Sequence, residues 1–334
     1  MPIDLGIYHR RLHKLAYYTR HSPFGLLPHR LLAKSIEPVL AEFARLPSEI
    51  QQQIRQRVDY CNRQNQPFTL SGSLTPVGLA GNFKRGSHTS AYYYDLAALL
   101  RYFPAEARFA YEFGDVTHIP AQPAFVKSRP IRSDNQHSVL LKLDSVRHFY
   151  IYPDRTPFAA KRDQLVWRGA AHQEQRLRFL RQYHDHPQCD VGCVHKQSIG
   201  QPYHRSFMSV GQQLQYKYIL SIEGNDVATN LKWILASRSL CFMTTPVYET
   251  WLLEGLLQPE VHYVHLQPDY SDFEEKLAFY QQHPDAAERI IRNANAYMQP
   301  FFNSRQELIT SLLVMQKYFE LATDNQPAGD AEIF

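Results

Sequence analysis

Two short segments combine glycine with cationic or polar side chains where a strand is expected to give way to a helix. In the first, Arg168 and Gly169 follow an apolar run, and Arg176 lies one helical turn into the next segment. Glycine lets a ligand approach the backbone closely, and guanidinium groups form paired hydrogen bonds with phosphate oxygens. The segment therefore favours a phosphate site, although a plain glycine turn with solvated arginines has the same pattern.

The second segment begins at Gly224, which is followed by Asn225 and Asp226. Thr229 stands where it would cap a helix, and Lys232 lies in the first turn of that helix. The positive end of a helix and a lysine both favour a diphosphate. Simple helix capping explains the same residues, but two such turns in one half of the chain together favour an anionic ligand.

The elements around these turns alternate between strands and helices. Strands are expected at residues 165–167, 189–194, 218–222 and 240–243, and helices at 173–183, 229–237 and 248–257. This alternation predicts parallel βαβ units, whose ligands bind beyond the carboxyl ends of the strands. A proline-rich break at residues 153–157 is expected to separate this half from the first.

The first half is expected to hold a different mixture of elements. Helices are expected at 49–61 and 92–101, and strands at 69–74, 107–113, 139–143 and 148–151. The chain is expected to end in helical stretches at 273–299 and 304–321, followed by a polar tail that has little to bury and is expected to fray.

Composition limits the classes of protein that remain. A chain of 334 residues is long enough for two domains, and a net charge of +4 lacks the concentrated basicity of a nucleic-acid-binding protein. No apolar stretch reaches the roughly 20 residues that span a membrane, and no signal-peptide run is present, which predicts a soluble cytoplasmic protein. Its four cysteines show no recognisable zinc spacing, which predicts buried thiols and no metal site.

The first thirty residues interleave basic and apolar side chains. The basic ones are His9, Arg10, Arg11, His13, Lys14, Arg20, His21, His29 and Arg30, and the apolar ones include Leu12, Leu15, Tyr17, Tyr18, Phe24, Leu26 and Leu27. This pattern fits a basic surface that faces an anionic membrane, and it fits equally the solvated face of an N-terminal helical region.

Several motifs follow one another in the second half of the chain. They are Trp-Arg-Gly at 167–169, Lys-Tyr-Ile-Leu at 217–220, the Gly224 turn, Lys232, Ser-Arg-Ser-Leu at 237–240, Tyr-Glu-Thr-Trp at 248–251 and Pro-Glu-Val-His-Tyr at 259–263. In this order they resemble glycosyltransferase family 90, and the resemblance covers about residues 105–300. That family includes capsule-associated proteins, animal protein O-glucosyltransferases and bacterial lipopolysaccharide-modifying enzymes; the Gly-Asn-Asp turn is most similar to the last group.

The resemblance implies an α/β protein of the GT-B fold, with two Rossmann-like domains that face a central cleft. It implies an acceptor-side domain at residues 1–155, a UDP-sugar-binding domain at 156–300, a helix crossing back at 301–322 and a flexible tail at 323–334. It also implies an inverting transfer, without metal or cofactor, from a UDP-sugar to a hydroxyl of a lipopolysaccharide core or related glycan. The implied partners are the donor and a lipid-linked oligosaccharide, with peripheral contact at the inner face of the cytoplasmic membrane and no nucleic acid.

Two alternatives share the same fold. One is a non-catalytic protein that binds nucleotides or carbohydrates, and the other is a capsule-polymer glycosyltransferase. A dehydrogenase is disfavoured because no G-x-G-x-x-G motif follows an expected strand.

The resemblance also assigns roles to single residues. Asp115 matches the family's general base, a carboxylate that removes the proton of the attacking hydroxyl, although a turn residue that caps Gly114 would look the same. Arg176 matches the arginine on the donor diphosphate, with Gly169 and the backbone of Ala170 beside it.

The chain departs from the animal members at the second donor-binding segment. Ala228 and Asn230 stand where those members have a serine and an arginine. The candidates to compensate are Lys232, Asn225 and Arg238, and a different hold on the pyrophosphate is the alternative. Glu249 is expected to accept hydrogen bonds from the ribose hydroxyls, with a solvated helix residue as the alternative.

On the acceptor side, Lys84 and Arg85 lie in a glycine-bounded loop that also contains His88. They are expected to bind phosphate or carboxylate groups of the acceptor, and a solvated loop is the alternative. His118 follows Asp115 closely, which makes it a further candidate for acceptor contact.

Overall fold

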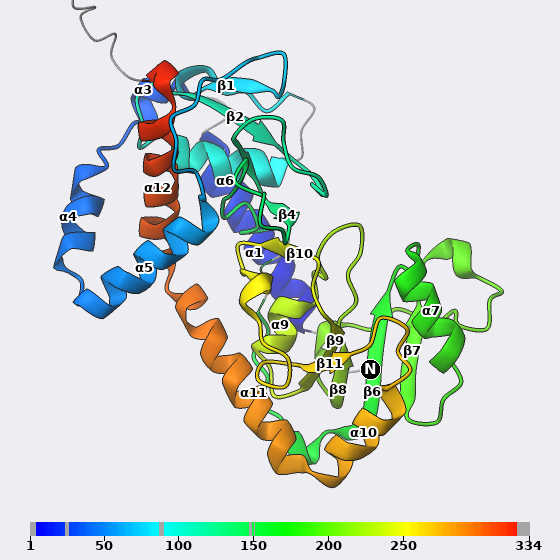
Figure 1. Ribbon diagram of the computed structural model, residues 1–334. Coiled ribbons are helices and arrows are strands. Elements are labelled where there is room, and N and C mark those ends of the chain that lie inside the picture. Colours follow the sequence, from blue (N-terminus) through cyan, green and yellow to red (C-terminus); the bar gives the residue numbers. More distant parts are fainter. Residues whose placement is uncertain (1–4, 24–26, 87–89, 147–148, 150, 326–334) are drawn as a thin grey trace, which may run out of the picture. The chain divides into compact units, whose positions relative to one another are not determined.

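A computed structural model describes residues 5–23, 27–86, 90–146, 149 and 151–325 (Figure 1). The chain divides into two units, and we name each after its larger sheet. The five-stranded unit comprises Met1–Lys14, His148–Val247 and Leu252–Gln299. The four-stranded unit comprises Leu15–Arg147, Tyr248–Trp251 and Pro300–Phe334.

The larger sheet of the five-stranded unit is parallel at every pairing. In spatial order its strands are β11 (Val264–Leu266), β9 (Leu240–Thr244), β8 (Tyr216–Leu220), β6 (Arg162–Gly169) and β7 (Cys189–Cys193). The chain passes from β6 to β7 on one side and then to β8 on the other side of β6. A topological switch point therefore lies at the carboxyl ends of β6 and β8, where open α/β sheets bind ligands.

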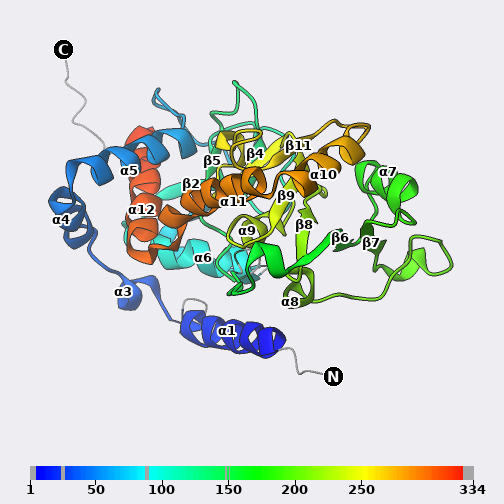
Figure 2. The ribbon, with the colours of Figure 1, turned by 90° about the horizontal axis from the view of Figure 1, so that it is seen from below.

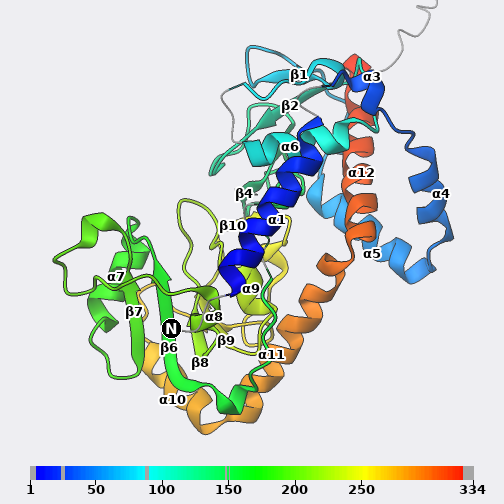
Figure 3. The same ribbon diagram turned by 180° about the vertical axis from the view of Figure 1, so that it is seen from behind.

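The helices of this unit are α7 (Glu174–Tyr183), α8 (Val210–Gln213), α9 (Leu231–Leu235), α10 (Phe273–Gln282) and α11 (Pro284–Met298). Helices α9 and α11 contact β9 (Figure 2), and α7 contacts β7 (Figure 3). Tyr218, Leu220 and Phe242 in the central strands are fully buried. Such continuous apolar strands are typical of a parallel sheet that is covered on both faces.

In the four-stranded unit, β2 (Arg108–Glu112), β3 (Ala124–Val126) and β5 (Ser138–Leu140) are parallel, and β1 (Val77–Leu79) pairs antiparallel with β2. A separate antiparallel pair joins β4 (Ser128–Pro130) to β10 (Tyr248–Thr250). Because β2 and β3 are parallel neighbours, the residues that follow them meet at one edge of the sheet.

The remaining helices are α1 (Leu5–His21), α3 (His29–Leu32), α4 (Glu37–Arg45), α5 (Ser48–Cys61), α6 (Ser90–Leu100) and α12 (Ser304–Leu321). Helix α12 packs along α5 (Figure 1), where Arg57 and Glu307 form an ion pair of 2.6 Å. Asn303 begins α12 by accepting hydrogen bonds from the backbone N–H groups of Arg305 and Gln306.

The expected α/β class is confirmed, as are the helices at 49–61 and 92–101 and the strand at 107–113. The strand expected at 69–74 is wrong. That segment is a turn region, and the side chain of Gln122 accepts a hydrogen bond of 2.7 Å from the backbone N–H of Ser71.

One further expectation in the second half is wrong. Residues 248–257 form β10 and a short 3-10 turn rather than a helix, because Leu253 adopts a left-handed conformation with φ of 60° that ends any helical run. The helical stretch expected at 273–299 is confirmed. It consists of two helices, since α11 begins at Pro284, which removes a backbone donor.

The expected flexible tail is anchored at its start. Thr323–Asn325 form a 3-10 turn, and Asp324 forms an ion pair of 2.6 Å with Arg108 on β2. The side chain of Asn325 also bonds the backbone N–H and C=O of Arg108. The rest of the tail, His88 and two residues of the strand expected at 148–151 lie outside the described residues.

Candidate functional site

The loops that follow β6 and β8 are joined to each other at the switch point. Arg176, on the first turn of α7, makes most of this joint. Its Nη1 donates to Ala170 O at 2.8 Å in the loop after β6. Its Nε and Nη2 donate to Glu223 O and Ile222 O, both at 3.0 Å, in the loop after β8.

The planar guanidinium of Arg176 thus satisfies carbonyl groups of two loops at once. Burial lowers its pKa, and a Cβ atom at residue 224 would lie 3.0 Å from its Nη2, which explains Gly224. The direct phosphate contact expected for Arg176 stays a prediction. The structure shows a side chain that fixes the shape of both loops.

Neighbouring glutamines reinforce the joint. Gln173 Nε2 donates to Asn225 Oδ1 at 2.7 Å, and Gln175 Nε2 lies 3.3 Å from the carbonyl oxygens of Glu223 and Gly224. The sequence reasoning did not single out either glutamine. Their position near Arg176 at the start of the expected helix is the feature that could have predicted their role.

Gly169 is required by packing. A Cβ atom there would lie 2.6 Å from Cζ2 of Trp167, so any larger residue would displace the indole ring. Beyond Gly169 the chain is held by its backbone, since Ala171 N–H donates to Cys193 Sγ at 3.3 Å. Exposed His172 stands next in this loop, with its ring 4.3 Å from that of His195 in the loop after β7.

Arg168 is engaged with protein groups, and its expected phosphate contact stays a prediction. Its Nη2 pairs with Asp190 Oδ1 on β7 at 2.5 Å, and its Nη1 and Nε donate to the carbonyls of Asp190 and Ser206. Tyr216 on β8 donates to the other carboxylate oxygen of Asp190 at 2.5 Å. Burial opposes ionisation of Asp190, but the hydrogen bonds of Tyr216 and Arg168 prevail and lower its pKa. Arg168 therefore stabilises the β6–β7 edge.

The loop after β8 is closed by Asn230. Its Nδ2 donates to Leu220 O at 3.0 Å, and its Oδ1 accepts from Ser221 Oγ at 3.1 Å. Helix α9 starts at Leu231 with no side-chain cap, so the expected capping by Thr229 is wrong. Thr229 is exposed on this loop, as is Asn225.

Two more of the expected donor residues are buried. Lys232 is 1% exposed, and its Nζ lies 3.9 Å from Oε1 of the equally buried Glu254. Asp226 is 5% exposed, and its backbone oxygen accepts from Gly224 N–H at 2.9 Å. Lys232 is therefore buried within α9, and Asp226 within the loop that precedes it.

Glu249 lies in the four-stranded unit, on β10, with no exposed surface. Its Oε1 accepts from Arg129 Nε at 2.7 Å, and its Oε2 accepts from Tyr60 Oη at 2.6 Å. Burial and the nearby Glu249 carboxylate raise the pKa of Tyr60. A carboxylate with both oxygens engaged and no exposure is a structural group, in contrast to the ribose contact expected for it.

Asp115 follows β2 at the edge where β2 and β3 end. Gly114 before it has a φ of +118°, a backbone conformation that favours glycine, and so directs the chain away from the strand. The carboxylate is 38% exposed, and its Oδ1 lies 3.0 Å from Nζ of Lys127, which follows β3 and is 4% exposed. A buried ammonium thus orients an accessible carboxylate at this edge of the sheet.

The remaining acceptor candidates lie in the same unit. His118, which is 64% exposed, contacts Glu112 through Nε2 and Oε2 at 2.9 Å. Lys84 and Arg85 are exposed and line a cavity of about 590 Å³.

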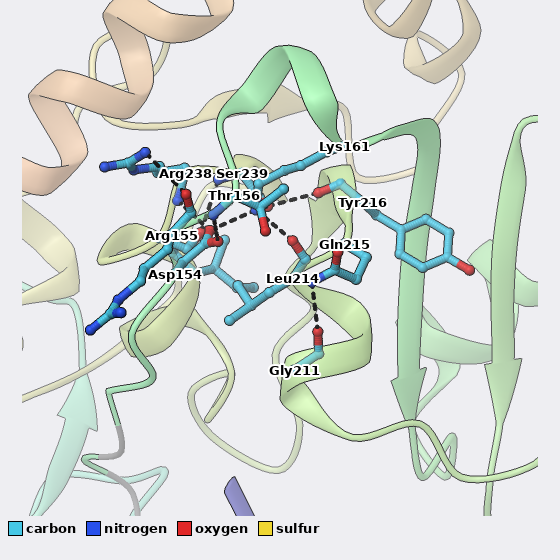
Figure 4. A network of polar contacts seen from close by, with 12 residues as sticks. Asp154, Arg155, Thr156, Lys161, Gly211, Leu214, Gln215, Tyr216, Arg238 and Ser239 are labelled. Carbon is cyan, nitrogen blue, oxygen red and sulfur yellow. Dashed lines mark hydrogen bonds and ion pairs between the residues drawn. The ribbon is translucent and has the colours of Figure 1, made fainter. Parts of the chain in front are cut away.

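A buried lysine network supports the start of β6 (Figure 4). Lys161 Nζ donates to Asp154 Oδ2 at 2.6 Å, to Leu214 O at 2.5 Å and to Ser239 Oγ at 2.8 Å. Burial lowers the pKa of Lys161, although Asp154 opposes that shift. The backbone N–H of Arg238 also donates to Asp154 Oδ2, so the 237–240 motif serves this network.

Among the described residues, no set of three or more His, Cys, Asp or Glu side chains is placed to hold a metal ion. No helix within the described part of the chain has the length and apolar character needed to cross a bilayer.

The sequence of this chain is similar to those of known proteins. The model of glycosyl transferase family 90 matches residues 145–328. The chain is 58% identical to O-glucosyltransferase LpsA of Dichelobacter nodosus over 313 residues, which cover 94% of this chain and 97% of that protein. It is 27% identical to Protein O-glucosyltransferase 2 of Danio rerio over 116 residues, which cover 35% of this chain and 23% of that protein.

Proposed function

The chain belongs to glycosyl transferase family 90 and is a glycosyltransferase, and from that premise we propose that it transfers a sugar from a UDP-sugar to a hydroxyl of a lipopolysaccharide core or related glycan. We further propose that the transfer inverts the anomeric centre and needs no metal ion. Glucose is the first sugar to test, because the relative from Dichelobacter nodosus is named as an O-glucosyltransferase. Enzymatic activity in the family sets aside a purely binding role.

The joint between the β6 and β8 loops is the observation that carries the donor assignment. Arg176 fixes both loops at the switch point, where exposed backbone N–H groups and helix ends favour a diphosphate. Since Arg168, Arg176 and Lys232 bind protein groups, we propose that the diphosphate is held mainly by backbone N–H groups, together with exposed Asn225 and Thr229. Preorganised donors of this kind can stabilise the charge that develops on UDP.

We propose Asp115 as the general base. The acceptor oxygen attacks C1 of the sugar while the bond from C1 to the β-phosphate oxygen breaks and its electron pair leaves on UDP. Asp115 takes the proton of the attacking hydroxyl, and Lys127 holds the carboxylate in position. A GT-B architecture, in which two Rossmann-like units serve donor and acceptor, is part of this proposal; the parallel sheet of the five-stranded unit supports it.

Peripheral contact with the inner face of the cytoplasmic membrane completes the proposal. No Asp or Glu occurs between residues 5 and 36, and Leu12 and Leu15 of α1 are each 65% exposed beside Lys14. Basic residues with exposed leucines favour an anionic bilayer. Sedimentation with vesicles tests this: binding to anionic vesicles that fails with neutral ones supports it, and equal recovery with both contradicts it.

The donor is tested by incubating the purified protein with UDP-glucose, UDP-galactose, UDP-xylose, GDP-mannose or CMP-sialic acid and a lipopolysaccharide core acceptor, with EDTA present. We expect acceptor-dependent release of UDP from at least one UDP-sugar at a rate that EDTA leaves unchanged. Release only from a GDP- or CMP-sugar, or only after a divalent metal is restored, would contradict the proposal.

A further inference from the structure

A cavity of about 590 Å³ in the four-stranded unit is lined by charged residues of one sign only, all of them basic. It lies between α3, α6 and the segment that ends in Lys84 and Arg85. Its basic lining residues are His29, Lys84, Arg85 and Arg101, and no Asp or Glu stands among the described residues that line it. The other large cavity of this unit, about 1020 Å³, has Glu37, Glu106, Glu320 and Asp324 in its lining and therefore lacks this bias. The smaller cavity is thus suited to an anion.

The same cavity has an aromatic wall with polar edges. Phe83, Tyr93 and Tyr94 line it, and their ring centroids lie 5.1 Å apart for Phe83 and Tyr93 and 5.2 Å apart for the two tyrosines. Tyr93 Oη donates to Phe83 O at 3.2 Å, which fixes the ring, and burial raises the pKa of Tyr93 so that its hydroxyl stays protonated. Aromatic faces beside amide and hydroxyl groups suit the apolar faces and hydroxyls of a sugar ring.

The cavity is connected to the strand that carries the proposed base. The Phe83 ring packs on Phe109, Tyr111 and Phe113, with centroids 5.2, 5.2 and 6.3 Å away. These three residues alternate along β2 and its extension, so they share one face of the strand. Phe113 lies two residues before Asp115, and one aromatic layer therefore links the cavity wall to the Asp115 turn.

We propose that this cavity is an acceptor subsite that binds a saccharide bearing a phosphate or carboxylate group, with Lys84 and Arg85 as the contacts to the anion. The inference rests on the proposed function and extends it to the acceptor's chemical class. The donor is assigned to the five-stranded unit, so changes in this cavity should affect acceptor binding alone.

The test is direct binding of a lipid-free, phosphorylated core oligosaccharide, measured by calorimetry. Lys84→Ala/Arg85→Ala should raise its Kd by about tenfold or more, because two charge-assisted contacts are lost. The matched control, Arg45→Ala/Arg55→Ala, removes the same charge from exposed positions of the same unit outside this cavity and should leave Kd unchanged. If the alanine variant fails to fold, Lys84→Gln/Arg85→Gln takes its place.

Two modified oligosaccharides show whether the bound anion is a phosphate or a carboxylate. Loss of affinity after the oligosaccharide is dephosphorylated identifies phosphate, and loss after its carboxyl groups are reduced identifies carboxylate. The inference is overturned if the cavity variant binds the oligosaccharide as the wild type does, or if it weakens UDP binding instead.

Because binding is measured without turnover, a result that overturns the acceptor subsite is distinct from one that overturns the proposed function. A protein that binds the anionic saccharide through Lys84 and Arg85 but transfers no sugar would refute the proposed function alone. Transfer with an unchanged acceptor KM in the double variant would refute the subsite alone.

Discussion

Single cations at the switch point act on the protein itself. Arg168 forms an ion pair with Asp190 and donates to neighbouring carbonyl groups. Arg176 donates to carbonyl groups of two loops. We expect a guanidinium in such a position to shape the site rather than to contact the ligand. Its effect on donor binding should therefore be inseparable from its effect on local stability.

Arg176→Ala tests this at the residue scale. It removes the Arg176 donor from three carbonyl groups, of which, among the described residues, only Glu223 O keeps another side-chain donor, Gln175 Nε2. We expect a loss of about 2 kcal/mol or more in unfolding free energy together with weaker UDP binding. Arg176→Lys should restore little, because one ammonium cannot replace a planar fork. Denaturant unfolding and calorimetry measure both effects, with exposed Arg178→Ala on the same helix as control. Weaker UDP binding at unchanged stability would instead indicate direct phosphate contact.

Asp115→Asn tests the proposed base. We expect kcat to fall by about 10²–10⁴-fold, because an amide cannot accept the hydroxyl proton, while the Kd for UDP stays unchanged. Steady-state kinetics and calorimetry provide the two values. Asp134→Asn, an exposed carboxylate of the same unit, is the control and should retain wild-type turnover. A variant of Asp115 with near-normal kcat would remove it from the chemistry.

At the scale of elements, the β4–β10 pair depends on a buried charge cluster. Arg129 and Glu249 have no exposed surface, and Arg129 also donates to the carbonyls of Tyr60, Cys61 and Ser138. Removing one member of a buried pair leaves the other charge uncompensated, which is costly.

Glu249→Gln should therefore reduce the unfolding free energy by about 3–5 kcal/mol. The UDP affinity of the folded protein should not change, since Glu249 lies on no donor loop in this account. Urea unfolding followed by calorimetry below the unfolding transition distinguishes the two roles. A drop in UDP affinity without a loss of stability would restore Glu249 as a ribose ligand.

Another buried carboxylate lies on helix α6 and predicts that the stability of the protein depends on pH. Asp95 accepts from Tyr17 Oη of α1 at 2.7 Å and from Ser145 N–H at 3.1 Å, yet burial raises its pKa to about 7. Between about pH 4 and pH 7 the folded protein then holds a proton that the unfolded chain has released. Stability contributed by this group is complete below pH 4 and is lost as the pH rises towards 7.

The difference in unfolding free energy between wild type and Asp95→Asn isolates this effect. Relative to the variant, the wild type should lose stability on the order of 4 kcal/mol from pH 4 to pH 7. Denaturant titrations at several pH values measure the difference. A difference that stays constant with pH would mean that Asp95 titrates alike in both states.

At the scale of the whole molecule, the sequence predicted the alternation of strands and helices in the second half and the strand before Asp115. Strand periodicity and turn residues are local signals, so they can be recognised without knowledge of the tertiary structure. The exception at 248–257 was a segment whose pairing partner, β4, lies more than a hundred residues earlier. Its pairing could not be read from local pattern.

The roles of charged residues were harder to predict for the same reason. Sequence spacing placed Arg168, Arg176 and Lys232 beside the turns that follow two strands, but it could not show which carbonyl or carboxylate each one contacts. Glu249 was expected on a helix, as a ribose contact, and lies in a buried strand. Partners distant in sequence decide whether a charge is a ligand contact or a structural group.

The central claim, a direct displacement at the sugar C1 assisted by a carboxylate, is tested most directly by the anomeric configuration of the first product formed. Proton NMR can follow the reaction of UDP-α-glucose with a core acceptor in the presence of EDTA. A product with a β-linkage from the earliest time point is the result that the account predicts. An α-linked product, or no transfer until a metal ion is added, would contradict it.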